Sequence, residues 1–431
     1  MSSNDEKIIV EVTREDLENL LCKELDSNIK VENFTSKSLT KPGDNYGSTI
    51  LAVEVFYHKD GTTETHKLPI VAKLVPESLF LRQLFDIETT FNKEVRAYTF
   101  VAPEFYKLQK EKMFSENEIL NVFSKYFGSR SNKQDDINMK ADESAVLLME
   151  NLKFSGYEIR ERRKGLNLKH MEFSIMKLAH FHALAVALKL LKPQVFKEKI
   201  LKTCEGFEIG KSHDEREIEK SISNTLQFVK DVPECVPYIE RIGNALHTDI
   251  KMRKEKTEPP PREPFATIVH NDFWVNNMMF KYDKSVNEID DDKDHEAPTA
   301  MKFVDFQVTI YESPVRDLIF FLFTSSEDGL IEKHFDDLIK LYHKTFVEIL
   351  TKLDCDTQPF SYQHFQEEMN AVLPSEFPHI LYLLNPICAD SEGMEEQSNV
   401  TRDSMFKKRG GDVYKKRVSC FVQKFINNGW L

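Results

Sequence analysis

The stretch HNDFWVNNMMF, from His270 to Phe280, decides how this sequence is interpreted. Within eight consecutive residues of an otherwise apolar run it places a histidine, an aspartate and an asparagine. Polar side chains in such a run are either caps of a structural turn or groups that perform chemistry, because burying them without a partner is unfavourable. Both interpretations fit the stretch alone, so the surrounding sequence has to separate them.

A second acidic residue, Asp305, lies 33 residues after Asp272 in FVDFQ. Both aspartates end apolar, strand-like runs, FATIVH and MKFV, and a hairpin between these runs would bring the two carboxylates together. A carboxylate and an amide oxygen can share a hard cation, which predicts an Mg²⁺ site at Asn277 and Asp305. Asp272 would then be available to accept a proton from a hydroxyl group. An ordinary turn capped by Asn and Asp explains the same residues about as well.

Two charged residues nearer the N-terminus favour the chemical interpretation. Lys73 lies in PIVAKLVP, an apolar strand-like run in which an unpaired lysine would be unfavourable. Glu94 follows 21 residues later in FNKEVRAY, which has the pattern of a helix. A strand lysine held by a helix glutamate clamps the nucleotide phosphates in kinase-type phosphoryl transfer. Their order, ahead of a loop with Asp and Asn five residues apart, is specific to that chemistry.

Two further segments are predicted to contact a nucleotide. KPGDNYGSTI joins two strand-like runs and contains Gly43 and Gly47, whose backbone amides could cover phosphates. It lacks a full GxGxxG pattern, so a plain hairpin turn is the alternative. LLMENL follows the last strand of this part of the chain, and the backbone of Glu150, Asn151 and Leu152 would there bind the adenine edge. Adenine binding by LLMENL is supported only by the position of this segment in the chain.

The pattern of predicted elements changes near residue 150. A helix capped by Thr13 and extending to about Leu25 is followed by strands at 33–40, 48–58 and 67–76, a helix at 87–101 and a strand at 144–152. Helices are then predicted at 169–191, 214–230 and 315–325, with short strands within 264–280 and 300–307. Segments 128–143 and 284–299 have the composition of exposed insertions. We therefore predict an α+β fold with two lobes, residues 1–150 and 151–431.

Composition narrows the class of protein. The net charge of −13 argues against nonspecific nucleic-acid binding, which depends on clustered Lys and Arg. We expect no secretory signal in MSSNDEKIIVEV and no membrane insertion, because no run approaches the roughly 18 apolar residues of a membrane span. Six cysteines without a CxxC pair favour reduced thiols and a cytoplasmic protein. Most of the 32 phenylalanines should fill the core, while some could line an apolar ligand cavity.

With these residues placed, the chain resembles the ecdysteroid kinase-like family, small-molecule kinases related to choline kinases and aminoglycoside phosphotransferases. The most specific matches are HNDFWVNNMMF and FVDFQ, which are similar to the family's HGDxWxxN loop and DFQ triplet. Further similar stretches extend over nearly the whole chain: KPGDNYGS, VAKLVP, FNKEVRAY, LLMENL, KLAHFHALAVALK and ESPVRDLIFFLFTS. The resemblance implies a two-lobed protein-kinase-like fold, with a small antiparallel-sheet N-lobe containing one main helix and a larger, mostly helical C-lobe.

The resemblance also implies a role for each candidate residue. Asp272 would be the catalytic base. Asn277 and Asp305 would bind Mg²⁺. Lys73 and Glu94 would form the clamp on the phosphates of ATP.

Two neighbouring residues are expected to support the loop, and two others differ from the related patterns. His270 and Asp317 would support the geometry of the loop. Asn271 stands where the family usually has glycine, and asparagine tolerates left-handed backbone angles better than other residues. We therefore expect the loop to keep its shape. Gln307 ends the triplet in place of the glycine of protein kinases, so a large flip of the preceding aspartate is not expected.

The candidate residues and the family resemblance together predict ATP- and Mg²⁺-dependent phosphorylation of a hydroxyl on a small molecule. The family resemblance, the many phenylalanines and Trp274 in the loop favour an apolar alcohol such as an ecdysteroid. A protein kinase is disfavoured, since no APE-like segment follows Asp305. A non-catalytic kinase-like binding protein is an alternative, although such proteins usually lose one of the positions held here by Lys73, Asp272, Asn277 and Asp305. A kinase for a polar amino alcohol or aminoglycoside-like substrate is another, in keeping with the net charge of −13.

Overall fold

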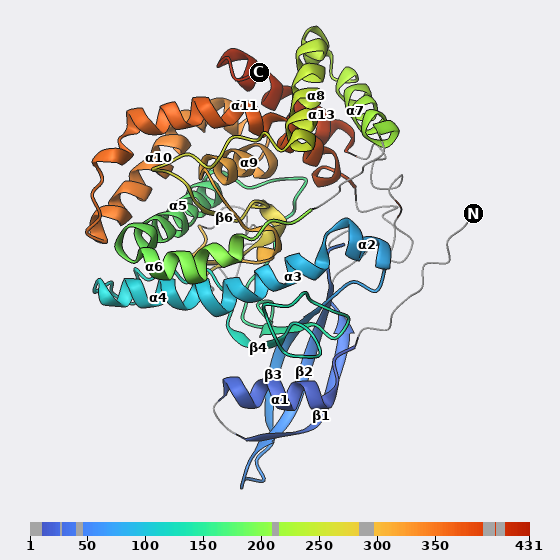
Figure 1. Ribbon diagram of the computed structural model, residues 1–431, viewed down its shortest axis with the longest axis vertical. Helices are drawn as coiled ribbons and strands as arrows, with labels where there is room; N and C mark the ends of the chain where they lie inside the picture. Colours follow the sequence, from blue (N-terminus) through green and yellow to red (C-terminus); the bar gives the residue numbers. More distant parts are fainter. Residues whose placement is uncertain are drawn as a thin grey trace.

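A five-stranded antiparallel sheet occupies one end of the protein and a mostly helical region the other (Figure 1). The computed structural model describes residues 11–25, 28–39, 46–208, 215–283, 297–390, 401 and 410–431. The α+β class, the antiparallel sheet near the N-terminus and the helical remainder of the chain are confirmed. The division of the chain at residue 150 stays a prediction.

The large sheet has the strand order β1-β2-β3-β5-β4. Its strands are β1 (Ile29–Ser38), β2 (Thr49–Lys59), β3 (His66–Leu74), β4 (Tyr126–Arg130) and β5 (Val146–Glu150). Strand β3 is central, so Lys73 lies between Ile50 of β2 and Leu147 of β5. Such a position, flanked on both sides by apolar strands, removes the lysine from water.

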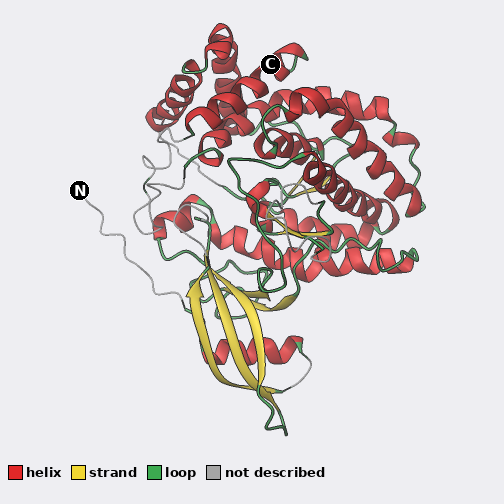
Figure 2. Ribbon diagram, turned by 180° about the vertical axis from the view of Figure 1, so that it is seen from behind, coloured by secondary structure: helices red, strands yellow, loops and turns green. Residues whose placement is uncertain are grey.

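Helix α1 (Arg14–Glu24) lies against this sheet (Figure 2). It begins as predicted at Thr13, whose side chain accepts a hydrogen bond from the Asp16 amide while the Asp16 carboxylate accepts one from the Thr13 amide. Its leucines Leu17, Leu20 and Leu21 are buried. At Gly128 of β4 an added Cβ would lie 2.9 Å from the Leu20 Cβ, so only glycine permits this close approach.

A long helical segment crosses from the sheet toward the helical region. After α2 (Leu79–Leu84), it consists of α3 (Ile87–Arg96), the turn η1 (Ala97–Val101) and α4 (Ala102–Glu111). The helix predicted at 87–101 is therefore confirmed, and the helical path extends to Glu111. Phe91, Val95 and Tyr98 are buried on its inner face, which also carries Glu94.

The expectation of an exposed insertion at 128–143 is only partly correct: residues 133–135 and 138–140 are exposed, but residues 128, 131–132 and 141 are buried. Gly128 to Arg130 belong to β4, and Asn132 is buried. The following loop is attached to α3, because the Ala141 amide donates to the Glu88 carbonyl and the Asn92 side chain donates to the Met139 carbonyl at 2.6 Å. The charged composition of the segment reflects its outward side chains, whereas its backbone polar groups find partners inside the protein. Of the second predicted insertion, residues 284–296 lie outside the described residues.

The helical region is built mainly on α5, which packs against α10. Its elements are α5 (Leu168–Leu191), α6 (Pro193–Val195), η2 (Phe196–Ile200), η3 (Leu201–Cys204), α7 (Glu215–Lys230), η4 (Pro233–Tyr238), α8 (Ile239–Glu255), α9 (Val315–Ser325), α10 (Leu330–Lys352), η8 (Gln358–Phe360), α11 (Tyr362–Ile387) and α13 (Gly411–Asn427). Helix α5 is long and apolar enough to cross a membrane by length and composition alone, yet 72% of its apolar segment is buried inside the molecule.

Four short strands carry the candidate site. They are β6 (Thr267–Val269), β7 (Met278–Lys281), β8 (Ala300–Phe303) and β9 (Ile310–Glu312), with the turns η5 (Val275–Asn277) and η7 (Phe306–Val308) beside them. Strand β7 pairs with β8, and β6 pairs with β9. The predicted hairpin between the FATIVH and MKFV runs is therefore wrong, because β6 takes its partner from beyond the DFQ triplet.

Most of the described phenylalanines are buried, as predicted. A cluster of aromatic side chains joins α13 to α9 and α11, with Phe421 stacked on Phe377 at 4.9 Å between ring centroids and packed edge-on against Phe323 at 5.1 Å. These rings hold the helices of the region together. They are part of the core.

Candidate active site

The loop that follows β6 is fastened by the buried carboxylate of Asp317, at the start of α9. The His270 amide donates to Asp317 Oδ2 at 2.6 Å, and the Asn271 amide donates to Oδ1 at 2.7 Å. Both carboxylate oxygens thus accept charge-assisted hydrogen bonds from consecutive backbone amides. The supporting part expected for Asp317 matches these contacts.

The backbone of Asn271 adopts the left-handed conformation, with φ of 65°. Asparagine is among the few non-glycine residues that accept this conformation readily, which agrees with the expectation that the loop tolerates Asn271. The side chain has a second use that glycine could not supply, because its Oδ1 accepts a hydrogen bond from Arg316 Nε at 2.6 Å. Arg316 in turn pairs with the buried Glu376 of α11.

His270 is completely buried beside the loop. Its Nε2 lies 3.0 Å from the Val304 carbonyl, and its Nδ1 has no hydrogen-bond partner among the described residues. Since a carbonyl can only accept, the ring donates from Nε2. Burial lowers the pKa of His270 and keeps the ring neutral. These contacts connect the loop to the residue before Asp305 and suit a structural support.

Asp272 and Asn277 form a closed pair within the loop. Asn277 Nδ2 donates to the Asp272 carbonyl at 2.9 Å and to its carboxylate Oδ2 at 2.7 Å. The β7–β8 pairing then brings Asn277 to the end of β8, where its carbonyl accepts a hydrogen bond from the Val304 amide at 3.0 Å. Asn277 is thereby adjacent to both aspartates, and its side-chain oxygen is directed away from Asp272.

The environment of Asp272 suits a group that exchanges a proton. Burial raises the pKa of its carboxyl to about 7, helped by the nearby Asp305 carboxylate and opposed by hydrogen bonds from the Asn277 and Trp274 side chains. A pKa near neutral lies in the range that suits a general base. Perturbed carboxyl groups of this kind concentrate at functional sites.

Lys73, Glu94 and Asp305 form a three-charge cluster between the sheet and the helical region. Lys73 Nζ is ion-paired with Glu94 and donates to Asp305 Oδ1 at 2.8 Å. The side chains of Lys73 and Glu94 are only 3% and 2% exposed, while that of Asp305 is 27% exposed. Burial alone would lower the pKa of Lys73, but the Asp305 and Glu94 carboxylates raise it overall, so the lysine stays charged. Asp305 is therefore the member of the cluster most open to a ligand.

Asp305 is held in place by the residue that follows it. Its backbone is left-handed, with φ of 68°, and the next ring, Phe306, is buried. Phe306 stacks on Phe123 at 4.8 Å and packs edge-on against Tyr98 at 5.9 Å. Gln307 is also buried and hydrogen-bonds to Glu94. This anchoring fits the expectation that the aspartate does not flip.

The donor set suits a hard divalent cation. Asn277 Nδ2 donates a hydrogen bond to Asp272, so the Asn277 Oδ1 atom is left to coordinate a cation. Asp305 provides a partly exposed carboxylate as a second ligand. Oxygen ligands of this kind, few in number, are typical of Mg²⁺ bound together with substrate phosphates. Asn277 and Asp305 thus fit the ion that the sequence predicts.

The two nucleotide-contact segments are only partly placed by the structure. Gly47 lies half-buried just before β2, while Gly43 lies outside the described residues. Glu150 ends β5, and the carbonyls of Asn151 and Leu152 already accept hydrogen bonds from the Ser155 and Tyr157 amides. A bound base would have to use other backbone groups of this segment. The Glu150 side chain accepts hydrogen bonds from the Lys125 amide and the Ser155 hydroxyl and is not part of the charge cluster.

A group of buried polar residues on α3 has no counterpart in the sequence expectations. Lys93 is fully buried, donates to the Glu205 carbonyl and lies 4.5 Å over the Phe207 ring. Arg96 is also buried and donates to the Lys202 carbonyl at 3.0 Å and the Ile137 carbonyl at 2.9 Å. These bonds fix the helix that carries Glu94. The only sequence signal was two cations beside Glu94, and their carbonyl partners are not encoded in any side-chain pattern.

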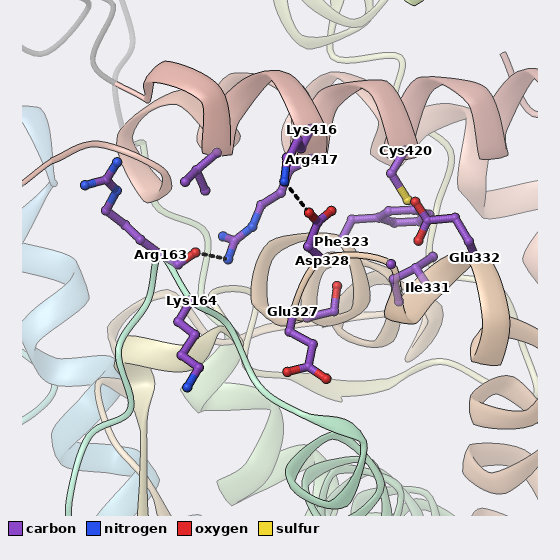
Figure 3. A pocket seen from close by; sticks show the side chains of 13 residues that line it. Arg163, Lys164, Phe323, Glu327, Asp328, Ile331, Glu332, Lys416, Arg417 and Cys420 are labelled. Carbon is purple, nitrogen blue, oxygen red and sulfur yellow. Dashed lines mark hydrogen bonds and ion pairs between the residues drawn. The ribbon is translucent and has the colours of Figure 1, made fainter. Parts of the chain in front are cut away.

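A cavity of about 260 Å³ lies between α9, α10 and α13 (Figure 3). None of the predicted site residues lines it. Two of its cations are engaged within the protein: Lys416 pairs with Asp328, and Arg417 donates to the Thr324 carbonyl at 2.7 Å. Arg417 also reaches the Arg163 carbonyl, so this cavity is bounded by groups that join α13 to its neighbours.

Replacing Asp317 with alanine is expected to lower the free energy of unfolding by about 3–5 kcal/mol, because it breaks buried charge-assisted hydrogen bonds to two amides and a histidine. Urea denaturation followed by circular dichroism measures this change. Asp337→Ala on the exposed face of α10 is the control and should stay within about 0.5 kcal/mol of the wild type. Equal unfolding midpoints for the two variants would contradict the role of Asp317 in holding the loop.

Several solved structures of small-molecule kinases are similar to this chain, with low sequence identity and low TM-scores. An ethanolamine kinase from Plasmodium vivax is 10% identical, with a TM-score of 0.37, over 95% of this chain and 86% of its own. A spectinomycin phosphotransferase in complex with ADP and spectinomycin is 8% identical, with a TM-score of 0.37, over 95% of this chain and 99% of its own. An amicoumacin kinase in complex with AMP-PNP and Ca²⁺ is 10% identical, with a TM-score of 0.35, over 94% and 97%. We infer nothing from similarities at this level.

No curated protein matches the chain significantly. The sequence model of the ecdysteroid kinase-like family, however, matches residues 42–355, which include every candidate residue described above. Since this match extends over more than half of the 431 residues, the chain belongs to the ecdysteroid kinase-like family.

Proposed function

We propose that this protein transfers the terminal phosphoryl group of ATP to a hydroxyl group of a small apolar alcohol, such as an ecdysteroid, in an Mg²⁺-dependent reaction. Family membership supports a small-molecule kinase. The observation that carries the proposal is that the Lys73–Glu94–Asp305 cluster lies beside the Asp272–Asn277 pair. The Val304 amide, next to Asp305, donates to the Asn277 carbonyl, and the Asp305 carboxylate helps to raise the pKa of Asp272. The cluster is suited to a nucleotide and its metal, and the pair to an acceptor hydroxyl.

At the nucleotide end, Lys73 supplies a fixed positive charge. Its pairing with buried Glu94 restricts the ammonium group to one position, at which it would contact the phosphates of ATP. Bound Mg²⁺, held by Asn277 and Asp305, would neutralise negative charge on the phosphates. Lys73 and Asp305 are 2.8 Å apart, so the lysine also orients the carboxylate that would hold the metal.

At the acceptor end, Asp272 orients the hydroxyl and accepts its proton. The hydrogen bond from Asn277 Nδ2 fixes the carboxylate before any substrate arrives. Pre-positioning of this kind contributes to catalysis because the reacting groups need no rearrangement. Phosphoryl transfer depends mainly on such positioning and on charge stabilisation, with the base orienting the nucleophile.

Family membership supports an apolar acceptor. The aromatic residues that the sequence suggested as further support have other roles in the structure. The phenylalanines counted in favour of an apolar cavity lie mostly in the core. Trp274 hydrogen-bonds to Asp272 and so has a bracing part in the loop. Support for an ecdysteroid acceptor therefore comes from the family's description.

A competition assay with labelled ATP tests the proposal. An ecdysteroid panel is offered beside choline, ethanolamine and an aminoglycoside, and labelled product is separated by chromatography. We expect transfer to hydroxylated steroids and none to the amines, with Asp272→Asn as the inactive control. Transfer to the amines alone would overturn the acceptor class and leave the kinase in place. ATP binding without transfer to any acceptor would favour a non-catalytic binding protein.

Replacing Lys73 with methionine is expected to raise the dissociation constant of Mg²⁺–ATP roughly 10–100-fold, the equivalent of one charge-assisted hydrogen bond. It should also destabilise the fold by about 3–5 kcal/mol, because Glu94 would be left buried without its partner. Calorimetry measures the first effect and urea denaturation the second.

The double variant Lys73→Met/Glu94→Gln separates the two effects of that change. Removing the buried charge should restore stability while ATP affinity stays low. ATP affinity equal to that of the wild type in both variants would disprove the clamp.

The proposal places the enzyme in the cytoplasm, without membrane insertion. Support comes from α5, whose apolar residues are explained by packing within the protein against α10. Fractionation of cells that express the tagged protein measures this. Recovery in the membrane pellet after a high-salt and carbonate wash would contradict it.

A further inference from the structure

We infer that His182 and Tyr342 are positioning residues for the loop that carries Asp272, an inference that rests on the proposed function. They complete a buried hydrogen-bonded chain, Tyr342–His182–Asp317, that ends on the loop amides. Neither residue touches the site itself. Their effect on phosphoryl transfer would come through Asp317 alone.

The chain is continuous at hydrogen-bond distances. Tyr342 OH lies 2.7 Å from His182 Nδ1, and His182 Nε2 lies 3.1 Å from Asp317 Oδ2. The same Oδ2 accepts from the His270 amide at 2.6 Å. Four groups from separate parts of the sequence are therefore linked in one line that ends two residues before Asp272.

The direction of the hydrogen bond to Asp317 follows from the groups involved. Burial and the Asp317 carboxylate raise the pKa of Tyr342 well above its ordinary value, so the phenol keeps its proton. Its hydroxyl shares a hydrogen bond with His182 Nδ1. Burial by itself would raise the pKa of Asp317, but hydrogen bonds from His182 and the His270 amide hold it below its usual value. An ionised carboxylate only accepts. His182 therefore donates from Nε2 to the Asp317 carboxylate.

The members of the chain come from three helices and are all buried. His182 lies on α5, Asp317 on α9 and Tyr342 on α10, and each is at most 1% exposed. Water does not compete for these bonds, and hydrogen bonds in such surroundings are stronger than in solvent. The His182 carbonyl also accepts from Thr267 Oγ1 at 3.0 Å, which ties α5 to β6 at the beginning of the loop. The packing of the helices therefore sets the position of the loop.

His182 and Tyr342 each have a matched control elsewhere in the protein. His180 lies two residues from His182 on α5 and is also buried, but its Nε2 has no hydrogen-bond partner among the described residues. Tyr414 is as buried as Tyr342, and its hydroxyl likewise has no partner in the described part of the chain. These residues report the effect of losing a buried ring or hydroxyl without the link to the loop.

Four variants test the inference: His182→Leu, His180→Leu, Tyr342→Phe and Tyr414→Phe. Amide hydrogen exchange of the peptide containing His270 and Asn271 is measured together with kcat, the KM for ATP and ATP affinity. We expect His182→Leu to speed exchange at these amides and lower kcat roughly 10–100-fold, the loss of one hydrogen bond to a charged group. ATP affinity and its KM should stay near wild-type values, because the chain does not touch the nucleotide side.

Two further comparisons make the result specific. His182→Gln retains a donor that can reach Asp317 and should recover part of kcat. Tyr342→Phe should lower kcat roughly 3–10-fold, the loss of one neutral hydrogen bond, and should have no further effect when added to His182→Leu. If His182→Leu does not fold, His182→Gln and Tyr342→Phe carry the test.

Equal exchange at His270 and Asn271 in the His182 and His180 variants would overturn the inference, as would equal kcat in the two phenylalanine variants. Amide hydrogen exchange and ATP affinity are both measured in the absence of an acceptor alcohol. Faster exchange in His182→Leu combined with no transfer by the wild-type protein would therefore uphold the positioning chain and overturn the proposed function instead.

Discussion

Replacing Asp272 with asparagine should lower the rate of phosphoryl transfer by about 10²–10⁴-fold, the usual contribution of a general base. The carboxylate is already held by the Asn277 side chain and would touch the acceptor hydroxyl rather than the nucleotide. An asparagine can keep the accepting oxygen that Asn277 needs, so the loop should survive the change. Transfer rates with labelled ATP measure the loss of turnover, and calorimetry measures the affinity for ATP.

The expected pattern is a large loss of turnover with ATP affinity nearly unchanged. Asp337→Asn, on an exposed position of α10, is the charge-matched control and should behave as the wild type. Near wild-type transfer in Asp272→Asn would mean that HNDFWVNNMMF is a structural turn and that the chemistry takes place elsewhere.

Replacing Asp305 with asparagine should raise the Mg²⁺ concentration needed for half-maximal activity by more than the roughly 10–100-fold typical of losing an outer-shell partner of a metal. A carboxylate holds Mg²⁺ more strongly than a neutral amide. The same change also removes a negative partner of Lys73, which lies 2.8 Å from Asp305. Initial rates measured against Mg²⁺ concentration at saturating ATP report the effect.

Asn277→Ala provides the comparison for Asp305→Asn. It removes a neutral ligand and should raise the Mg²⁺ requirement less. It also releases the hydrogen bond to the Asp272 carboxylate, so we expect its maximal rate at high Mg²⁺ to remain low. A wild-type Mg²⁺ dependence in Asp305→Asn would exclude this residue as a metal ligand.

Local features of the site were predictable because they depend on residues close in sequence. The apolar run around Lys73 and the helical pattern around Glu94 correctly predicted β3 and α3. The left-handed backbone of Asn271 follows from the small set of residues that tolerate it. Helix α1 could be placed from its capping residues and its leucines.

The predictions that failed wholly or in part concern partners that are distant in sequence. The strand before the loop pairs with β9 rather than with the strand before Asp305, and strand pairing depends on the whole arrangement of the chain around it. The charged segment 128–143 is attached to α3 through backbone groups, such as the Met139 carbonyl that accepts from Asn92. Composition reports which side chains prefer water and gives no information on where backbone groups find partners.

The sequence by itself determined which chemical groups this protein has and which local conformations they adopt. Tertiary structure alone decided which of those groups meet. Lys73 and Asp305 are 232 residues apart, and their 2.8 Å contact exists only because α3, β3 and the turn after β8 pack together. His182 and Tyr342, 160 residues apart, meet only because α5 packs on α10. The physical reason is that periodicity indicates which face of a helix is buried, whereas the partner on that face depends on the packing of all the helices at once.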